Sequence, residues 1–248
     1  MTLATCGYML SGLLRELRAR GIPFHNPHRK TNGAWNPMRS ARRLAAYLRH
    51  DPQVWGDQAR AWTWQDLHDW IDPLDARTAL PRGTKAYVDT MITPDRFGES
   101  RAHDEVPLDT LCTLLGDPGT LTHPAFHADT AWWAGALRTS RRRTLEYPLR
   151  VLARRGGQAL TETPRLTVGT GHSVKGGEAD HVIIAPDLSR QGAETWERRG
   201  DDRAQLVRLF YVMLTRARHS VTVLDPAGPG HVPLELLEPA PLMQKAAA

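Results

Sequence analysis

The chain has 248 residues, of which 41% are hydrophobic and 24% are charged, a composition typical of a folded globular protein and not of a disordered one. Lys and Arg outnumber Asp and Glu by 32 to 27, so the net charge of +5 is only mildly basic. The two cysteines, Cys6 and Cys112, lie far apart and exclude a disulfide framework or a zinc motif. No run is long and apolar enough to span a membrane, and the first residues lack the pattern of a signal peptide. We therefore expect a cytoplasmic protein without a membrane partner.

The first part of the chain predicts two helices separated by an extended segment and a loop. Apolar residues recur at helical spacing over residues 10–20, and Gly21 is expected to end that helix. Residues 22–25 are expected to be extended, and residues 26–37 form a loop rich in turn formers. A second helix is then expected to reach Arg49.

Residues 50–137 have a different texture, in which short helical patterns alternate with turns that contain Pro or Gly. Seven of the 8 tryptophans lie between Trp35 and Trp133. We interpret this part as a small helical module with the tryptophans in its core. Stacking of nucleic-acid bases on exposed tryptophans is the alternative.

A basic stretch follows, from Arg138 to Arg155. It contains seven arginines against the single acid Glu146. Clustered cations of this kind are expected where a protein contacts a phosphate backbone. A solvated basic helix face would have the same sequence, so both interpretations stay open.

The last part of the chain returns to an α/β pattern. Two short, apolar, β-branched runs predict strands at 166–170 and 181–185, and a third strand is expected at 220–224. A helix is expected between the second and third strands, over 203–218. This order of elements is part of a doubly wound parallel sheet, and the Pro-rich tail from residue 229 is expected to be loose.

Between the first two of these strands lies a loop of small residues that also carries an imidazole, a cation and a carboxylate. It closely resembles motif V of UvrD-like superfamily 1 DNA helicases, whose pattern is Thr-x-His-x-x-Lys-Gly-x-Glu. The fixed positions are all present, as Thr170, His172, Lys175, Gly176 and Glu178.

The run from Arg208 to Arg218 resembles motif VI of the same family, Arg-Leu-x-Tyr-Val-x-x-Thr-Arg-Ala. It departs upstream, where Gln205 and Leu206 stand in place of two glutamates. A buried helix with a charged C-terminus is the simpler interpretation, but it does not explain why the helix follows the motif V loop at the family's spacing. The N-terminal run 13–24 also resembles the helix and strand that follow motif IV.

The resemblance implies a fold and a domain organisation. The fold class is α/β, a RecA-like parallel sheet of the P-loop NTPase second domain, flanked by helices and interrupted by a mostly helical insertion. On this basis residues 1–49 are the first segment of the second RecA-like domain and residues 50–150 the helical insertion. Residues 151–228 complete the RecA-like domain, and residues 229–248 form the loose tail.

The half of such an enzyme that holds ATP is absent from the sequence. No Gly-Lys pair occurs anywhere, so there is no phosphate-binding loop of the Walker A type. The pair Asp104-Glu105 does not follow an apolar strand and cannot serve as the Mg²⁺-binding carboxylates. The cofactors implied by the resemblance, ATP and Mg²⁺, would therefore be held mainly by an N-terminal half. That half would lie on another chain or have been lost by truncation.

The resemblance also implies a role for each motif residue. Arg216 would be the catalytic arginine finger that reaches the γ-phosphate, and Gly176 and Glu178 would face the nucleotide. Thr170, His172 and Lys175 would contact single-stranded DNA, with Lys175 between the DNA and ATP sides. A departure from the family pattern, glycine at both 171 and 177, is expected to loosen this loop.

Each of these roles has a structural alternative. Arg216 could form a surface salt bridge, His172 could be a hydrogen-bonded structural histidine, and Lys175 and Glu178 could pair with each other. Three functions follow: a helicase half that needs its ATP-binding partner, a DNA-binding module without catalysis, or a protein-interaction remnant that uses the tryptophan-rich region.

Overall fold

A computed structural model of the protein describes residues 1–29, 33–75, 77, 79–94, 98–174, 176–198 and 200–237. The chain folds into two compact units. The first, here called the sheet unit, consists of Met1–Leu17, Phe24–Asn36 and Pro164–Ala248, and the second, the helical unit, of Arg18–Pro23 and Pro37–Thr163. The helical unit is larger than the expected insertion 50–150, because it also includes residues 18–23, 37–49 and 151–163. The expected loose tail from residue 229 includes residues 238–248, which lie outside the described residues.

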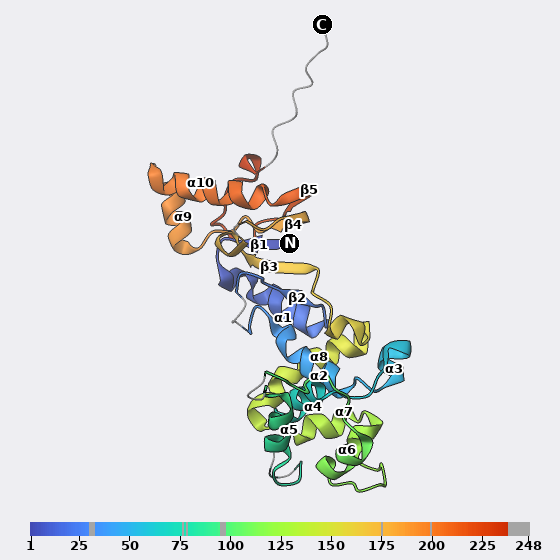
Figure 1. Ribbon diagram of the computed structural model, residues 1–248. Helices are drawn as coiled ribbons and strands as arrows, with labels where there is room; N and C mark the ends of the chain where they lie inside the picture. Colours follow the sequence, from blue (N-terminus) through green and yellow to red (C-terminus); the bar gives the residue numbers. More distant parts are fainter. Residues whose placement is uncertain are drawn as a thin grey trace. The chain divides into compact units, whose positions relative to one another are not determined.

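Five strands of the described chain form one sheet, and every pairing in it is parallel (Figure 1). The strand order is β2-β3-β1-β4-β5. The strands are β1 (Thr2–Ala4), β2 (Phe24–His25), β3 (Leu166–Thr170), β4 (Ala179–Ile184) and β5 (Ala217–Val223). The expected α/β class with a parallel sheet flanked by helices is therefore confirmed.

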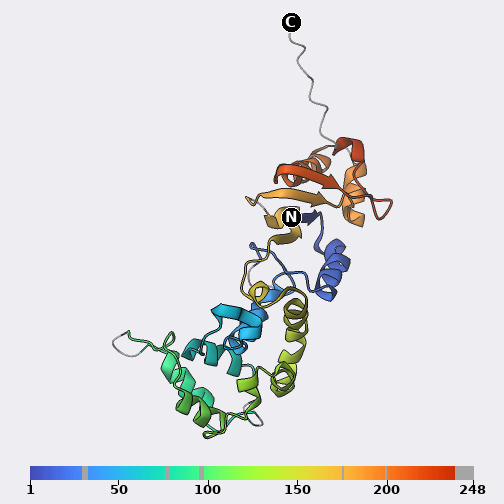
Figure 2. The ribbon, with the colours of Figure 1, turned by 90° about the vertical axis from the view of Figure 1, so that its right-hand side faces the viewer.

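The central strand β1 was not predicted from the sequence. Its three residues are too few to show an alternating pattern, yet Leu3 pairs with Gly169 of β3 on one side and Ile184 of β4 on the other. Figure 2 shows this short dark-blue strand beside the orange strands of the sheet. Only long-range pairing identifies it, since Leu3 and Ala4 are fully buried between segments more than 160 residues away in sequence.

Helices α9 (Arg190–Glu197) and α10 (Asp201–Leu214) belong to the sheet unit, as does most of α1 (Ser11–Ala19). The core pairs the sheet with the inner face of α10, and it includes Leu3, Val182, Ile184, Leu209, Phe210 and Met213. Burying each such side chain contributes about 1.5–3 kcal/mol. Together these contacts attach α10 firmly to the sheet.

The expected end of this helix at Arg218 is wrong, because α10 ends at Leu214. The reason is the sheet: the Arg216 carbonyl accepts a hydrogen bond from the Ala179 amide at 2.9 Å, and Ala217 then pairs with Ala179 in the β4–β5 ladder. The chain cannot stay helical where its backbone bonds to a neighbouring strand.

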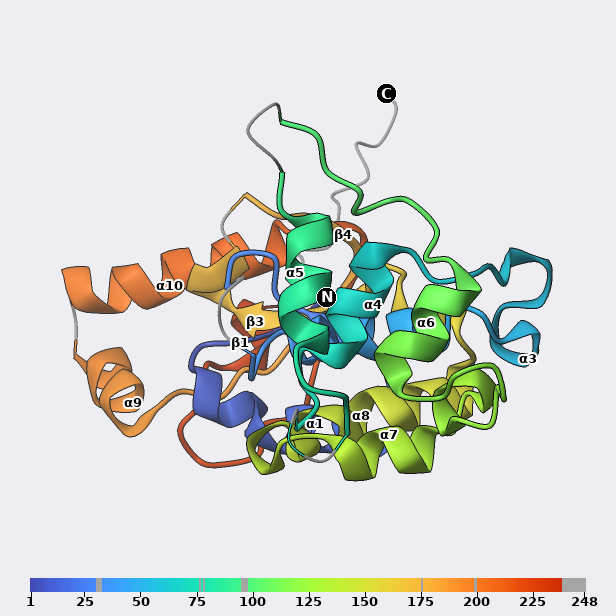
Figure 3. The ribbon, with the colours of Figure 1, turned by 60° about the horizontal axis from the view of Figure 1, so that its bottom comes forward.

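The helical unit contains the expected short helices, and Figure 3 shows α4 beside α5 and α7 beside α8. Their bounds are α2 (Ala41–Tyr47), α3 (Pro52–Trp55), α4 (Trp64–Ile71), α5 (Thr84–Ile92), α6 (Leu108–Leu115), α7 (Thr130–Ala136) and α8 (Thr139–Arg155). Local sequence sets several starts. Thr63 and Asp66 form a capping box at α4, and the Asp129 carboxylate accepts two backbone N–H bonds at α7.

Tryptophans fill the core of this unit, as expected. Trp64 is 1% exposed and Trp70 and Trp133 are fully buried. Trp133 stacks on Tyr47, with ring centroids 5.0 Å apart, and donates its indole N–H to the Trp70 carbonyl at 3.1 Å. These tryptophans are not available for stacking on bases.

The basic stretch becomes the long helix α8 and the residue before it. Several of its arginines hold the unit together, because Arg142 donates to the carbonyls of Gly135 and Leu137 and Arg155 donates to that of Gly21. In the described part of the chain, the exposed arginines of this stretch whose side chains make no hydrogen bond or ion pair are Arg141, Arg143 and Arg154. The stretch is thus partly structural and only partly free to meet a phosphate. No helix in the described ranges is long and apolar enough to cross a membrane.

Candidate functional site

The candidate site is the loop that connects β3 to β4. The chain leaves β3 at Thr170, makes the 3-10 turn η6 (Gly171–Val174) and enters β4 at Ala179. Gly176 has φ = +84°, a left-handed backbone conformation that strains any residue with a Cβ atom. The motif position Gly176 is therefore required by the path of the loop.

We expect Gly176→Ala to lower the free energy of unfolding by about 1 kcal/mol, purely through backbone strain, since nothing lies within 4 Å of an added Cβ. Gly12→Ala is a matched control in the first turn of α1, also with open space around the new Cβ. It should stabilise by about 0.5–1 kcal/mol. Urea denaturation of both variants tests this, and a neutral Gly176→Ala would contradict the positive φ.

Thr170 and Ser173 close the start of the loop. Ser173 Oγ accepts from the Thr170 amide at 2.9 Å and donates to the Thr170 carbonyl at 3.0 Å, while Thr170 Oγ1 accepts from the Ser173 amide at 3.3 Å. Thr170 is 5% exposed, so its hydroxyl is used within the loop. Of the three residues expected to contact DNA, His172 is exposed, and Lys175 lies outside the described residues.

The expectation that Gly171 loosens the loop is wrong. Gly171 is buried against α10, and a Cβ there would lie 2.6 Å from Leu209 Cδ1 and 2.8 Å from Met213 Cγ. Because Gly171 has no side chain, the turn packs directly on α10, the helix whose sequence resembles motif VI. At Gly177 an added Cβ would meet only ordinary contacts of 3.4 Å or more.

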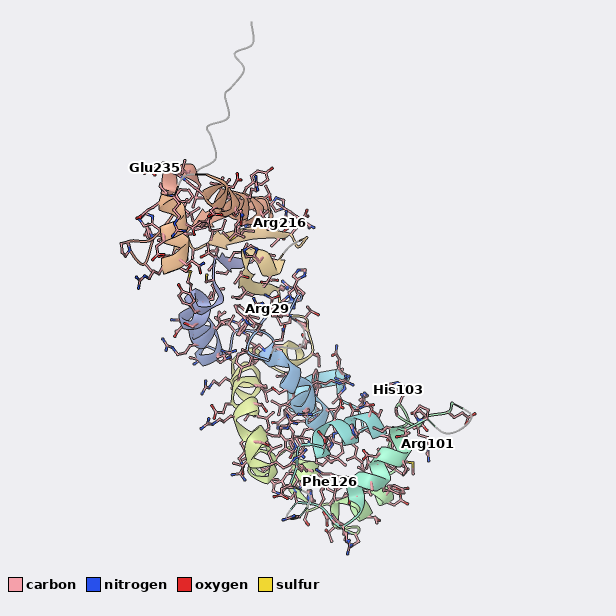
Figure 4. All side chains as sticks on the ribbon, turned by 90° about the vertical axis from the view of Figure 1, so that its left-hand side faces the viewer. Arg29, Arg101, His103, Phe126, Arg216 and Glu235 are labelled. Atoms are coloured by element: carbon pink, nitrogen blue, oxygen red, sulfur yellow. The ribbon has the colours of Figure 1, made fainter. Side chains whose placement is uncertain are left out.

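Arg216, labelled in Figure 4, follows α10. Its guanidinium folds back onto two backbone carbonyls. Nε donates to the Val212 carbonyl at 3.0 Å and Nη1 to the Gly177 carbonyl at 3.3 Å, while Nη2 lies 3.3 Å from Thr215 Oγ1. It makes no ion pair with a carboxylate of the described chain, so the surface salt bridge is not the arrangement seen. The Gly177 bond joins the segment that resembles motif VI directly to the loop that resembles motif V.

Glu178 forms an ion pair with Arg218, Oε2 to Nε, at 3.0 Å. Both side chains are more than half exposed, so the pair contributes at most about 1 kcal/mol and can exchange partners readily. The alternative pairing of Glu178 with Lys175 lies outside the described residues. Glu178 therefore remains able to turn toward a ligand hydroxyl.

Three further residues border this loop, and all three belong to the turn-rich segment 26–37, for which the sequence predicted no functional role. Asn26 is fully buried, and His28 and Arg29 line an open pocket of about 310 Å³ together with His172 and Ser173. The signal in the sequence was a run of polar and basic residues directly after the extended segment. Beside them, burial lowers the pKa of His25, whose ring nitrogen lies 3.2 Å from the Thr167 hydroxyl. The neutral form of this histidine is thereby favoured.

Comparison of the chain with protein-family models, curated proteins and solved structures found no match. Within the part of the chain that the structure describes, no three His, Cys, Asp or Glu side chains are arranged to hold a metal ion. The candidate site therefore rests on its own geometry.

Proposed function

We propose that this chain is the C-terminal portion of an ATP-dependent DNA helicase of the UvrD type, with its sheet unit as the second RecA-like domain. The observation that carries the proposal is the hydrogen bond from Arg216 Nη1 to the Gly177 carbonyl. The two segments that resemble motifs V and VI lie 39 residues apart at this bond, and the fold brings them into contact within one unit. A chance resemblance of two segments gives no reason for them to meet.

In this proposal the chain supplies positive charge and nucleotide contacts, and a separate N-terminal half holds the ATP phosphates and Mg²⁺. Arg216 would hold oxygens of the γ-phosphate in place of its carbonyl acceptors, and its guanidinium would stabilise the charge of the transition state. Glu178 would contact the ribose in place of Arg218, and Gly176 would keep the loop backbone open beside it. Bound ATP supplies the free energy of hydrolysis that drives movement along single-stranded DNA.

The same loop offers a physical link between the nucleotide and the DNA. The Gly177 carbonyl is bonded to Arg216, and the position of a Cβ on Gly177 lies 3.5 Å from His28 Nε2. A shift of Arg216 toward a nucleotide therefore releases a backbone group that also borders the pocket of His28 and His172. The proposal assigns the coupling between ATP hydrolysis and DNA movement to this contact.

The isolated chain is expected to show no ATPase activity, because no described group replaces the phosphate-binding loop or the Mg²⁺ carboxylates. Mixed with its ATP-binding half, supplied as a second polypeptide, it is expected to hydrolyse ATP and to do so faster with single-stranded DNA. A steady-state ATPase assay measures both. If the pure chain hydrolyses ATP in response to DNA, and Arg216→Ala abolishes this activity, the proposed need for a separate ATP-binding half is wrong. If the mixture binds DNA without any effect of nucleotide, a non-catalytic DNA-binding module is favoured.

A further inference from the structure

The pocket beside the motif V loop has two walls from distant parts of the sequence. His28 and Arg29 form one wall, after β2, and His172 and Ser173 form the other, in turn η6. Among the described residues, none that lines it is acidic. Two imidazoles and a guanidinium with no carboxylate between them favour an anionic ligand.

Asn26 joins the two walls. Its Nδ2 donates to the Val168 carbonyl at 3.0 Å and to Ser173 Oγ at 3.1 Å, and its Oδ1 accepts from the His28 amide at 3.0 Å. The side chain is fully buried and its donors and acceptor are used on both sides. Gly169 leaves the space for it, since a Cβ there would lie 2.6 Å from Asn26 Nδ2. Asn26 therefore fixes where His28 stands relative to His172.

Arg29 is held in place by a second set of contacts. Its guanidinium carbon lies 4.9 Å from the ring centroid of Trp35, which is 6% exposed. The Arg29 carbonyl accepts from Asn36 Nδ2 at 2.7 Å. Figure 4 shows Arg29 in this segment of the sheet unit. Stacking on a buried ring limits the rotamers of the arginine, so less entropy is lost when it binds an anion.

We propose that this pocket binds a phosphate of a single-stranded DNA backbone, with Arg29, His28 and His172 as its donors and Asn26 as the residue that positions them. Arginine forks match phosphate oxygens, and neutral or charged imidazoles can both donate. Ser173 Oγ is saturated by Asn26 and Thr170, so it shapes the pocket without contacting the ligand.

The pocket is larger than a phosphate group alone requires. A volume of about 310 Å³ is at the lower end of the range for small-ligand sites and leaves room for a sugar beside the phosphate. The choice of DNA as the source of the phosphate rests on the proposed helicase function. The anion site itself rests only on the pocket.

The test is the affinity of the 248-residue chain for a fluorescent oligothymidine, measured by anisotropy at two salt concentrations. Arg29→Ala and His172→Ala are each expected to raise Kd about tenfold or more, as expected for the loss of a charge-assisted hydrogen bond. Arg29→Ala should also lower the slope of log K against log salt by about 0.7. Arg190→Ala removes an arginine of α9 whose side chain is 94% exposed and should leave Kd unchanged. Normal binding by both pocket variants would overturn the proposal.

Asn26 is tested by a double-mutant cycle, because Asn26→Ala also affects folding. In the wild-type background Asn26→Ala should raise Kd about as much as a pocket variant does. In the Arg29→Ala/His172→Ala background it should add almost nothing to Kd while still lowering the melting temperature. An equal effect on Kd in both backgrounds would show that Asn26 acts through stability alone.

Further arms separate this inference from the proposed function. If inorganic phosphate binds to the wild-type pocket but not to the pocket variants, while these variants keep their affinity for the oligonucleotide, DNA is not the ligand of the pocket. Loss of DNA affinity in the pocket variants, with no ATPase in the reconstituted mixture, would support the pocket and contradict the helicase. Normal DNA affinity of these variants, in a mixture with full ATPase activity, would support the helicase and contradict the pocket.

Discussion

Replacing Arg216 by alanine is expected to lower ATP turnover of the reconstituted halves by about 10³–10⁵-fold, the contribution typical of an arginine finger. The effect is selective, because the guanidinium acts on charge that develops in the transition state. Arg216→Lys should recover little, since a lysine ammonium cannot fork toward two oxygens. KM for ATP is expected to change far less than kcat.

The structural cost of these variants is small by comparison. Arg216 Nε holds the Val212 carbonyl at the end of α10, and losing that hydrogen bond costs about 1 kcal/mol, or a few degrees in Tm. Arg190→Lys, on the exposed surface of α9, is the control for general effects of exchanging an arginine. Near-normal turnover of Arg216→Lys would make Arg216 a purely structural cap, and the assignment of motif VI would fail.

Replacing Trp133 by alanine is expected to destabilise the helical unit by about 3–5 kcal/mol. The side chain is fully buried, it stacks on Tyr47, and its indole N–H satisfies the Trp70 carbonyl. Alanine leaves a cavity and an unpaired buried carbonyl at once, so the two costs combine. Thermal unfolding followed by tryptophan fluorescence measures the change.

Trp132 is the matched control, because it directly precedes Trp133 in the same helix and is only half-buried. Its ring packs on His123 and Tyr47 at the edge of the core, so Trp132→Ala should cost clearly less. Below the melting temperature, Trp133→Ala should leave affinity for single-stranded DNA unchanged. A loss of DNA affinity in a folded Trp133→Ala protein would revive the base-stacking interpretation.

Local sequence predicted the elements whose pattern is long enough to see. Strand β3 appears with the expected bounds, 166–170, since a leucine and four β-branched or small residues stand between polar segments. The first helix ends before Gly21, which has φ = +56°. There a Cβ would lie 2.7 Å from the Arg150 carbonyl oxygen, so the glycine is needed for tertiary packing as well as for the turn. Only its conformational role could be inferred from the sequence.

The candidate site divides in the same way. The resemblance to motifs V and VI pointed to Arg216, Glu178 and His172. Asn26 was hidden because its role depends on partners that lie 142 and 147 residues away. A buried amide is selected by the geometry of its acceptors, and that geometry has no local signature. The same reason explains the bond that the Thr170 hydroxyl accepts from the Ser173 amide.

The sequence by itself determined the parallel α/β class, the tryptophan core of the helical unit and the two motif-like segments. Each of these features depends on the types of nearby residues and on their short-range spacing. Only the tertiary structure decided that Thr2–Ala4 is the central strand, that α10 ends at Leu214, and that Arg216 touches Gly177. These depend on backbone groups finding partners far along the chain. Hydrogen bonds between distant backbones carry almost no side-chain preference, so no pattern in the sequence records them.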